Sequence, residues 1–258
     1  MSAQRLRLLM LAGQGISSRI MYNALADDFD ICAVIQESRP SRRQLVRRRI
    51  SRLGPAKVAG QLMFMCYDRL FLQRRQQARI NELVSRYQLN TAPIPEGIVD
   101  SVESVNSDLT IGLLRRHAPD AVIVNGTRII SPGILSCVPA PFLNTHAGIT
   151  PRYRGVHGGY WALASRDADH CGVTVHLVDA GIDTGAVLYQ EAIETEAADG
   201  FHTYPIHQTA KAIPLMKKAL LDVAAGRVRP GQGIGPSRLW SHPTLFEYLR
   251  NRALIGVR

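Results

Sequence analysis

The chain opens with a short apolar run that ends at a glycine turn. Leu6 to Ala12 leads directly into Gly13-Gln14-Gly15. A short apolar run before such a turn is typical of a buried parallel strand. Apolar residues then recur at helical spacing from Ile16 to Ala26, and Ile31 to Ile35 forms a second short apolar run. The order strand, helix, strand predicts a βαβ unit with a right-handed crossover.

The same alternation of strands and helices resumes beyond residue 106. The apolar patterns predict strands over 121–124, 142–144, 173–178 and 186–193, and helices over 107–117, 158–166, 204–223 and 244–255. Pro214 should interrupt or kink the helix that contains it, and Ser17 and Ser18 are candidate caps for the first helix. We therefore expect an α/β fold, with a mostly parallel sheet flanked by helices and a short C-terminal tail.

The segment 36–106 breaks this alternation, and we interpret it as a helical insertion after the second strand. Arg39 to Arg52 predicts a basic helix, Val58 to Tyr87 predicts one or two further helices, and Leu89 to Gly97 should be extended or loop. The apolar stretch Val58 to Leu72 indicates a buried helix, with contact to a membrane surface as the alternative.

Much of the basic charge lies in this insertion. The formal net charge of the 258-residue chain is +10. A basic protein can bind nucleic acid, an anionic membrane surface or a polyanionic small molecule, and a solvated helix face is the plainer interpretation. No aromatic residues interleave with the arginines of 42–52, so we do not expect nucleic acid as a partner.

The spacing of the cysteines and the hydropathy of the chain argue against a metal-binding, membrane-spanning or secreted protein. The four cysteines are scattered without a CxxC pair, which indicates reduced, buried thiols and no metal site. No apolar run approaches the roughly 20 residues of a membrane-spanning helix, and the first residues do not form a signal peptide. We expect a cytoplasmic protein.

Three polar residues follow predicted strands and form a candidate catalytic set. Asn144 and His146 are two apart at the end of one strand, so their side chains point the same way. Asp183 lies in a glycine-flanked loop after another strand. A carboxylate near a histidine can orient the ring and hold it protonated. Such a set can run acyl transfer, with a donor for the oxyanion, a histidine that moves protons and a carboxylate that positions it.

Longer motifs around these residues resemble a known family. They are the run from Leu143-Asn144-Thr145-His146 to Pro151-Arg152-Tyr153-Arg154-Gly155, the strand Gly172-Val173-Thr174-Val175-His176, and the loop Gly181-Ile182-Asp183-Thr184-Gly185. Together they resemble the folate-dependent formyltransferases, which include glycinamide ribonucleotide transformylase, methionyl-tRNA formyltransferase, formyltetrahydrofolate hydrolase and the nucleotide-sugar N-formyltransferases. The resemblance covers about Asp120 to Gly226. Ala147-Gly148-Ile149-Thr150 departs from the Ser-Leu-Leu-Pro that the family often has after the histidine.

The resemblance implies a Rossmann-like formyltransferase fold and roles for single residues. Asn144 would donate to the developing oxyanion, His146 would stabilise that charge and shuttle a proton, and Asp183 would orient the histidine. N10-formyltetrahydrofolate would be the formyl donor, without a metal. Its pterin would lie against the cofactor-binding candidates, which are Thr127, Arg128, Ile129, Ile130, Asp179 and Gly181.

The resemblance leaves the amine acceptor open. The turn Gly13-Gln14-Gly15 precedes a helix and is similar to a loop that holds the substrate phosphate in glycinamide ribonucleotide transformylase, although a turn without a ligand fits the residues equally well. We assign residues 1–226 to a catalytic domain and 227–258 to a tail that is too short for the RNA-binding barrel of methionyl-tRNA formyltransferase. A nucleotide-linked amino sugar is the expected acceptor. Glycinamide ribonucleotide, a non-catalytic nucleotide- or RNA-binding protein, and a homodimer remain open.

Overall fold

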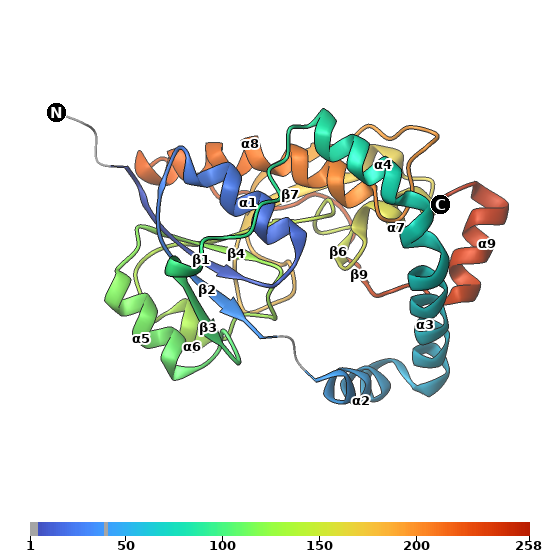
Figure 1. Ribbon diagram of the computed structural model, residues 1–258, viewed down its shortest axis with the longest axis horizontal. Coiled ribbons are helices and arrows are strands. Elements are labelled where there is room, and N and C mark those ends of the chain that lie inside the picture. Colours follow the sequence, from blue (N-terminus) through green and yellow to red (C-terminus); the bar gives the residue numbers. More distant parts are fainter. Residues whose placement is uncertain (1–4, 39–40) are drawn as a thin grey trace.

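The computed structural model describes residues 5–38 and 41–258, and it is built on a seven-stranded sheet (Figure 1). The strand order is β3-β2-β1-β4-β5-β7-β8. The strands are β1 (Arg7–Ala12), β2 (Asp30–Glu37), β3 (Val99–Val102), β4 (Ala121–Asn125), β5 (Phe142–His146), β7 (Gly172–Leu177) and β8 (Val187–Ala192). The strands from β3 to β5 are parallel, whereas β7 and β8 run antiparallel to their neighbours. The predicted α/β class and mostly parallel sheet are confirmed.

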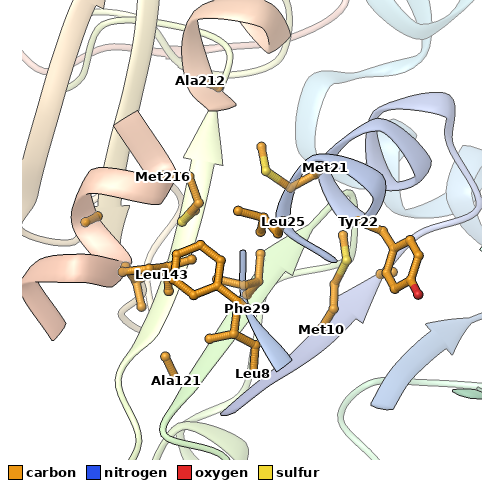
Figure 2. Packing of buried hydrophobic residues seen from close by; sticks show 14 of the residues in the cluster. Leu8, Met10, Met21, Tyr22, Leu25, Phe29, Ala121, Leu143, Ala212 and Met216 are labelled. Atoms are coloured by element: carbon orange, nitrogen blue, oxygen red, sulfur yellow. The ribbon is translucent and has the colours of Figure 1, made fainter. Parts of the chain in front are cut away.

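Helices cover both faces of the sheet because its central strands are apolar on both sides. In β1, Leu8 and Met10 face one core with α1 (Ile16–Ala26) and α8 (Tyr204–Ala224). Leu9 faces the opposite core, with α5 (Asp108–His117) and α6 (Pro132–Leu135). This is the period of two that a strand imposes on its side chains. Figure 2 shows the first of these cores, and each large side chain buried there contributes about 1.5–3 kcal/mol.

The segment after β2 forms a helical arm that projects from the sheet (Figure 1). The arm consists of α2 (Arg42–Leu53), α3 (Pro55–Tyr67), a π-helical turn (Asp68–Leu72) and α4 (Gln73–Arg86). Gly54 makes the sharp turn between α2 and α3 with φ of 80°, a value that favours glycine. At the far end of the arm, Arg79 lies 2.9 Å from Asp199 in an ion pair with little exposure. The arm is therefore fastened to the core at α4.

The arm agrees with the predicted helices, but the segment 36–106 is not helical throughout. Its first residues complete β2, and Val99–Val102 forms β3, an edge strand paired with β2. A strand of four residues is too short to show the alternation of apolar and polar side chains from which a strand is predicted. Arg39 of the predicted basic helix lies outside the described residues. The apolar stretch of α3 is buried on one face only: Phe64 is buried, whereas Met63 is exposed.

The C-terminal tail packs against both the arm and the core. Its strand β9 (Leu239–Trp240) pairs with β6 (Arg154–Gly155), which precedes α7 (Gly158–Ala164). Its helix α9 (Leu245–Ile255) begins with a capping box at Thr244 and contacts α3. Aromatic side chains from the arm, the core and the tail share one cluster. The ring centroid of Tyr248 in α9 lies 5.1 Å from that of Phe64 in α3 and 6.1 Å from that of Tyr160 in α7.

Two details of the local predictions are wrong, and a third is wrong in part. Ser17 and Ser18 do not cap α1: its N-cap is Gly15, and the Ser18 hydroxyl, inside the helix, donates to the Asn125 carbonyl at 3.2 Å. Of the interruption or kink predicted at Pro214, the interruption does not occur, because α8 continues through this residue as one helix of 21 residues. The free thiols are not uniformly buried, because Cys171 is buried but Cys66 is exposed on the arm. In the described part of the chain, no helix is long and apolar enough to cross a membrane.

Candidate active site

A cavity of about 730 Å³ lies where β4 and β5 end. In open α/β sheets this is where ligands bind. One side, which we call the catalytic wall, is formed by the ends of β4, β5 and β7 and the loops 126–130 and 178–183. The other side, the distal wall, comes from the arm and the tail. The distal wall comprises Leu45, Arg49, Arg52, Leu53, Lys57, Gln61, Leu239, Trp240, Ser241 and His242.

Asn144 and His176 face each other across the antiparallel pair of β5 and β7. The Asn144 amide nitrogen lies 3.1 Å from His176 Nε2, and His176 Nδ1 lies 2.7 Å from the Leu177 carbonyl oxygen. A carbonyl oxygen only accepts, so Nδ1 carries a hydrogen, and we assign Nε2 as the acceptor of the Asn144 N–H. This orients the Asn144 amide and leaves its second hydrogen for a ligand in the cavity.

His146 is buried, and a hydrogen bond from Nε2 orients its ring. Its Nε2 donates to the Tyr153 carbonyl at 2.7 Å, and its Nδ1 lies 3.4 Å from Asp183 Oδ2. Burial lowers the pKa of His146, and the Asp183 carboxylate only partly offsets this. The expectation that the carboxylate holds this ring protonated is therefore wrong, because the desolvation of a buried cation costs more than the carboxylate returns. A neutral ring with hydrogen on Nε2 leaves Nδ1 as a proton acceptor.

Asp183 is the residue that joins the two histidines. Its carboxylate accepts the Gly155 N–H at 2.9 Å and lies 3.7 Å from His176 Nε2. Burial raises the pKa of this carboxyl, but the two histidines and the Gly155 N–H outweigh burial and hold the pKa below its usual range. Asp183 is thus ionised at neutral pH. Its backbone φ is 50°, an uncommon value for a residue with a side chain, and it marks a loop held by its contacts.

The cofactor-binding candidates line the same cavity. Thr127, Arg128, Ile129, Ile130, Asp179 and Gly181 all lie along the catalytic wall. Buried Glu37, at the end of β2, organises the first loop: its carboxylate pairs with Arg128 Nε at 2.5 Å and accepts the Val105 N–H at 3.0 Å. Val124, Ile130 and Val178 provide an apolar lining on this side. The second loop is closed by Asp179, which accepts the Gly181 N–H at 3.0 Å.

Gly13-Gln14-Gly15 does not line this cavity. A glycine is needed at position 13 because the backbone after β1 packs closely against the backbone after β4. A Cβ at this position would lie 2.2 Å from the Gly126 carbonyl oxygen, and the Gly13 N–H donates to the Asn125 carbonyl at 2.9 Å. The local geometry favours a turn that joins two strand ends.

Several site residues could not be assigned from the sequence. Glu37, which supports Arg128, and the residues of the distal wall are placed by tertiary contacts, which leave no motif in the sequence. His176 could have been found, because it is the last residue of the motif Gly172-Val173-Thr174-Val175-His176 that carries the resemblance. In the structure it lies opposite Asn144. Among the described residues, no group of three or more histidine, cysteine or acidic side chains is arranged to hold a metal ion.

Comparison with known proteins identifies the class of protein that this fold and cavity define. Residues 66–212, more than half of the chain, match the model of the formyl transferase family. The chain belongs to this family. The match includes Asn144, His146, His176 and Asp183 and begins within the arm, at the end of α3.

The proteins that are similar to this chain in sequence include formyltransferases of two kinds. Over 129 residues the chain is 33% identical to methionyl-tRNA formyltransferase of Anaeromyxobacter sp. (strain K), which covers 50% of this chain and 41% of that protein. Over 96 residues it is 41% identical to phosphoribosylglycinamide formyltransferase of Mycobacterium tuberculosis, covering 37% of this chain and 43% of that protein. The chain thus matches less than half of the length of these relatives.

Solved structures resemble the chain over more of its length. A sugar N-formyltransferase from a Shewanella species superposes with a TM-score of 0.55 at 15% identity, covering 91% of this chain and 76% of that chain. Glycinamide ribonucleotide transformylase 1 from Symbiobacterium toebii gives a TM-score of 0.57 at 16% identity, covering 91% and 96%. At this identity the likeness establishes the Rossmann-like formyltransferase fold alone.

Proposed function

We propose that this protein transfers a formyl group from N10-formyltetrahydrofolate to a primary amine, and that the amine belongs to a nucleotide-linked amino sugar. The observation that carries the transfer reaction is the arrangement of Asn144, His146 and Asp183 on one wall of a cavity, with a neutral histidine beside an ionised carboxylate. Such a pair suits proton movement at neutral pH.

Each residue has a role in this reaction. The bound folate supplies the formyl carbon that the amine attacks. The free hydrogen of the Asn144 amide donates to the formyl oxygen as it gains negative charge. His146 Nδ1 takes the proton that the attacking amine loses, and Asp183 stabilises the resulting imidazolium at 3.4 Å. The protonated His146 then returns a proton to the departing folate nitrogen, so that the proton count closes.

The catalytic wall has the chemistry that a folate ring requires. A flat pterin carries donors and acceptors along its edge and apolar faces above and below. Backbone groups of the loops 126–130 and 178–181 supply polar partners, and the apolar side chains Val124, Ile130 and Val178 supply contact surface. Arg128 and Asp179, whose charges are paired with Glu37 and with loop donors, hold these loops in shape.

The second part of the proposal concerns the acceptor, and the distal wall supports it. The acceptor must reach Asn144 and His146 from the part of the cavity that the folate does not fill. That part is lined by Arg49, Arg52 and Lys57. A wall that carries three cations favours an acceptor with phosphate groups.

Mass spectrometry can test the transfer and the acceptor together. The protein is incubated with N10-formyltetrahydrofolate and a pool of nucleotide-linked amino sugars and glycinamide ribonucleotide. We expect one nucleotide-linked amino sugar to gain the mass of a formyl group, and the gain to vanish with the His146→Ala variant. If only glycinamide ribonucleotide were formylated, the proposal that the acceptor is a nucleotide-linked amino sugar would be wrong. Folate that is neither consumed nor transferred would overturn the enzyme and favour a nucleotide-binding protein on the same fold.

A further inference from the structure

The arm places three cations on the cavity without giving them acidic partners. Arg49 and Arg52 of α2 and Lys57 of α3 line the cavity. No ion pair among the described residues involves any of the three, whereas Arg128 on the opposite wall is paired with Glu37. Cations gathered on a concave surface attract an anion most strongly when no local carboxylate neutralises them. The structure therefore leaves their charge for a ligand.

The acidic groups of the cavity and its basic groups without an acidic partner lie on opposite walls. Its carboxylates, Asp179 and Asp183, both belong to the catalytic wall, and the distal wall contains none. A bound polyanion would be repelled from the reacting residues and attracted to the arm. A ligand with its phosphates on the arm would direct its other end toward Asn144 and His146. This separation orients a long substrate as well as binding it.

The distal wall is also built as a defined surface. Gln61 is buried, and its amide nitrogen donates to the His242 carbonyl at 2.7 Å, which ties α3 to the tail. His242 pairs with His157 at 2.9 Å. Burial, and then the charge of Arg49, lowers the pKa of His242 to about 4, so Arg49 lies beside a neutral ring.

We infer that Arg49, Arg52 and Lys57 form the anion site that binds the diphosphate of the acceptor, in place of the turn Gly13-Gln14-Gly15. The inference rests on the proposed function, because it gives the acceptor its place in the cavity. The arm is then the substrate-recognition element of this chain. Guanidinium groups bind phosphate oxygens through paired N–H donors, and lysine adds a compact charge.

Calorimetric titration with inorganic pyrophosphate, in buffer without divalent metal, tests the site on the full chain. The cavity variant is Arg52→Gln with Lys57→Gln, since both side chains are exposed and their loss should leave the fold intact. The matched control is Arg74→Gln with Arg75→Gln, which removes the same charge from exposed positions of α4 outside the cavity. Gln14→Glu places a negative charge at the glycine turn.

We expect the wild-type chain to bind pyrophosphate and the cavity variant to bind it at least about tenfold more weakly, since charge-assisted hydrogen bonds are lost. The control and Gln14→Glu should stay within about twofold of wild type, because screening limits the reach of distant charges. Equal weakening in the cavity variant and the control, weakening by Gln14→Glu alone, or no binding to the wild-type chain would overturn the inference.

The formyl-transfer assay separates this inference from the proposed function. If an amine is formylated but pyrophosphate binding does not depend on Arg52 and Lys57, the anion site is wrong and the reaction stands. If pyrophosphate binds as expected but no amine is formylated, the anion site stands and the proposed reaction fails. In the favourable case, the cavity variant raises the KM for the acceptor at least about tenfold and leaves the KM for the folate unchanged.

Discussion

The two walls of the cavity are specified in different ways. On the catalytic wall, Asn144 and His176 are opposed by the register of two paired strands, and Asp183 is held by the Gly155 N–H. On the distal wall, α2 and α3 meet the segment 239–242, far away in the sequence, through side-chain contacts such as that of Gln61 with His242. Strand register tolerates little change, whereas helical arms can be altered one residue at a time. The comparison suggests that the reaction and the choice of acceptor can vary separately.

The strongest test of the catalytic wall is Asp183→Asn. The amide keeps the shape of the carboxylate but cannot stabilise a protonated His146. We expect kcat for formyl transfer to fall by about 10³-fold or more, with little change in folate binding. Steady-state kinetics and a folate titration measure the two quantities, and Asp169→Asn, an exposed carboxylate away from the cavity, is the control. A loss below tenfold would remove Asp183 from proton transfer.

Asn144→Ala tests the oxyanion donor on the same wall. Its amide is positioned by His176 at 3.1 Å, and its remaining hydrogen faces the cavity ligand in our proposal. Removal of one such donor costs about 10²–10³-fold in kcat. The KM of the acceptor should change little, which distinguishes this wall from the arm. Asn81→Ala, on the exposed surface of α4, serves as the matched control, and equal losses in the two variants would contradict the assignment.

The sequence predicted the catalytic wall better than the distal wall for a physical reason. Asn144 and His146 share one strand, so their spacing alone places them together. The loop of Asp183 lies within a motif that was recognised by its residues. By contrast, Arg49 reaches the cavity only because α3 folds back onto α9 and the tail, through contacts between aromatic residues far apart in the chain. Such contacts leave no local pattern, so the basic helix could be predicted but not its place at the site.

The distal wall should loosen in acid, since a buried pair of neutral histidines supports it. Burial lowers the pKa of His157 to about 3 from an ordinary 6.5. As the pH falls below 6.5, the unfolded chain takes up a proton that the folded chain refuses, so the free energy of unfolding decreases until about pH 3. For His157 alone the loss at pH 4 is about 3 kcal/mol.

Denaturant titrations from pH 7 to pH 4 can measure this effect. The variant His157→Asn removes the titrating ring and keeps a residue that tolerates the φ of 59° at this position. We expect the variant to lose less stability than the wild-type chain between pH 7 and pH 4, by about 1–3 kcal/mol. Parallel curves for the two proteins would show that His157 is not the source of the acid sensitivity.

The smallest expected effect concerns His176, which acts through Asn144. If His176 Nε2 only orients the Asn144 amide, a side chain with an acceptor in the same place should preserve much of the activity. We expect kcat to fall about tenfold in His176→Leu, which has no acceptor, and to recover at least in part in His176→Gln. The recovery separates positioning from proton transfer, because glutamine cannot titrate. A change in the pH profile of kcat in His176→Gln would instead mean that His176 exchanges protons with Asp183, 3.7 Å away, and that the catalytic wall has a second titrating ring.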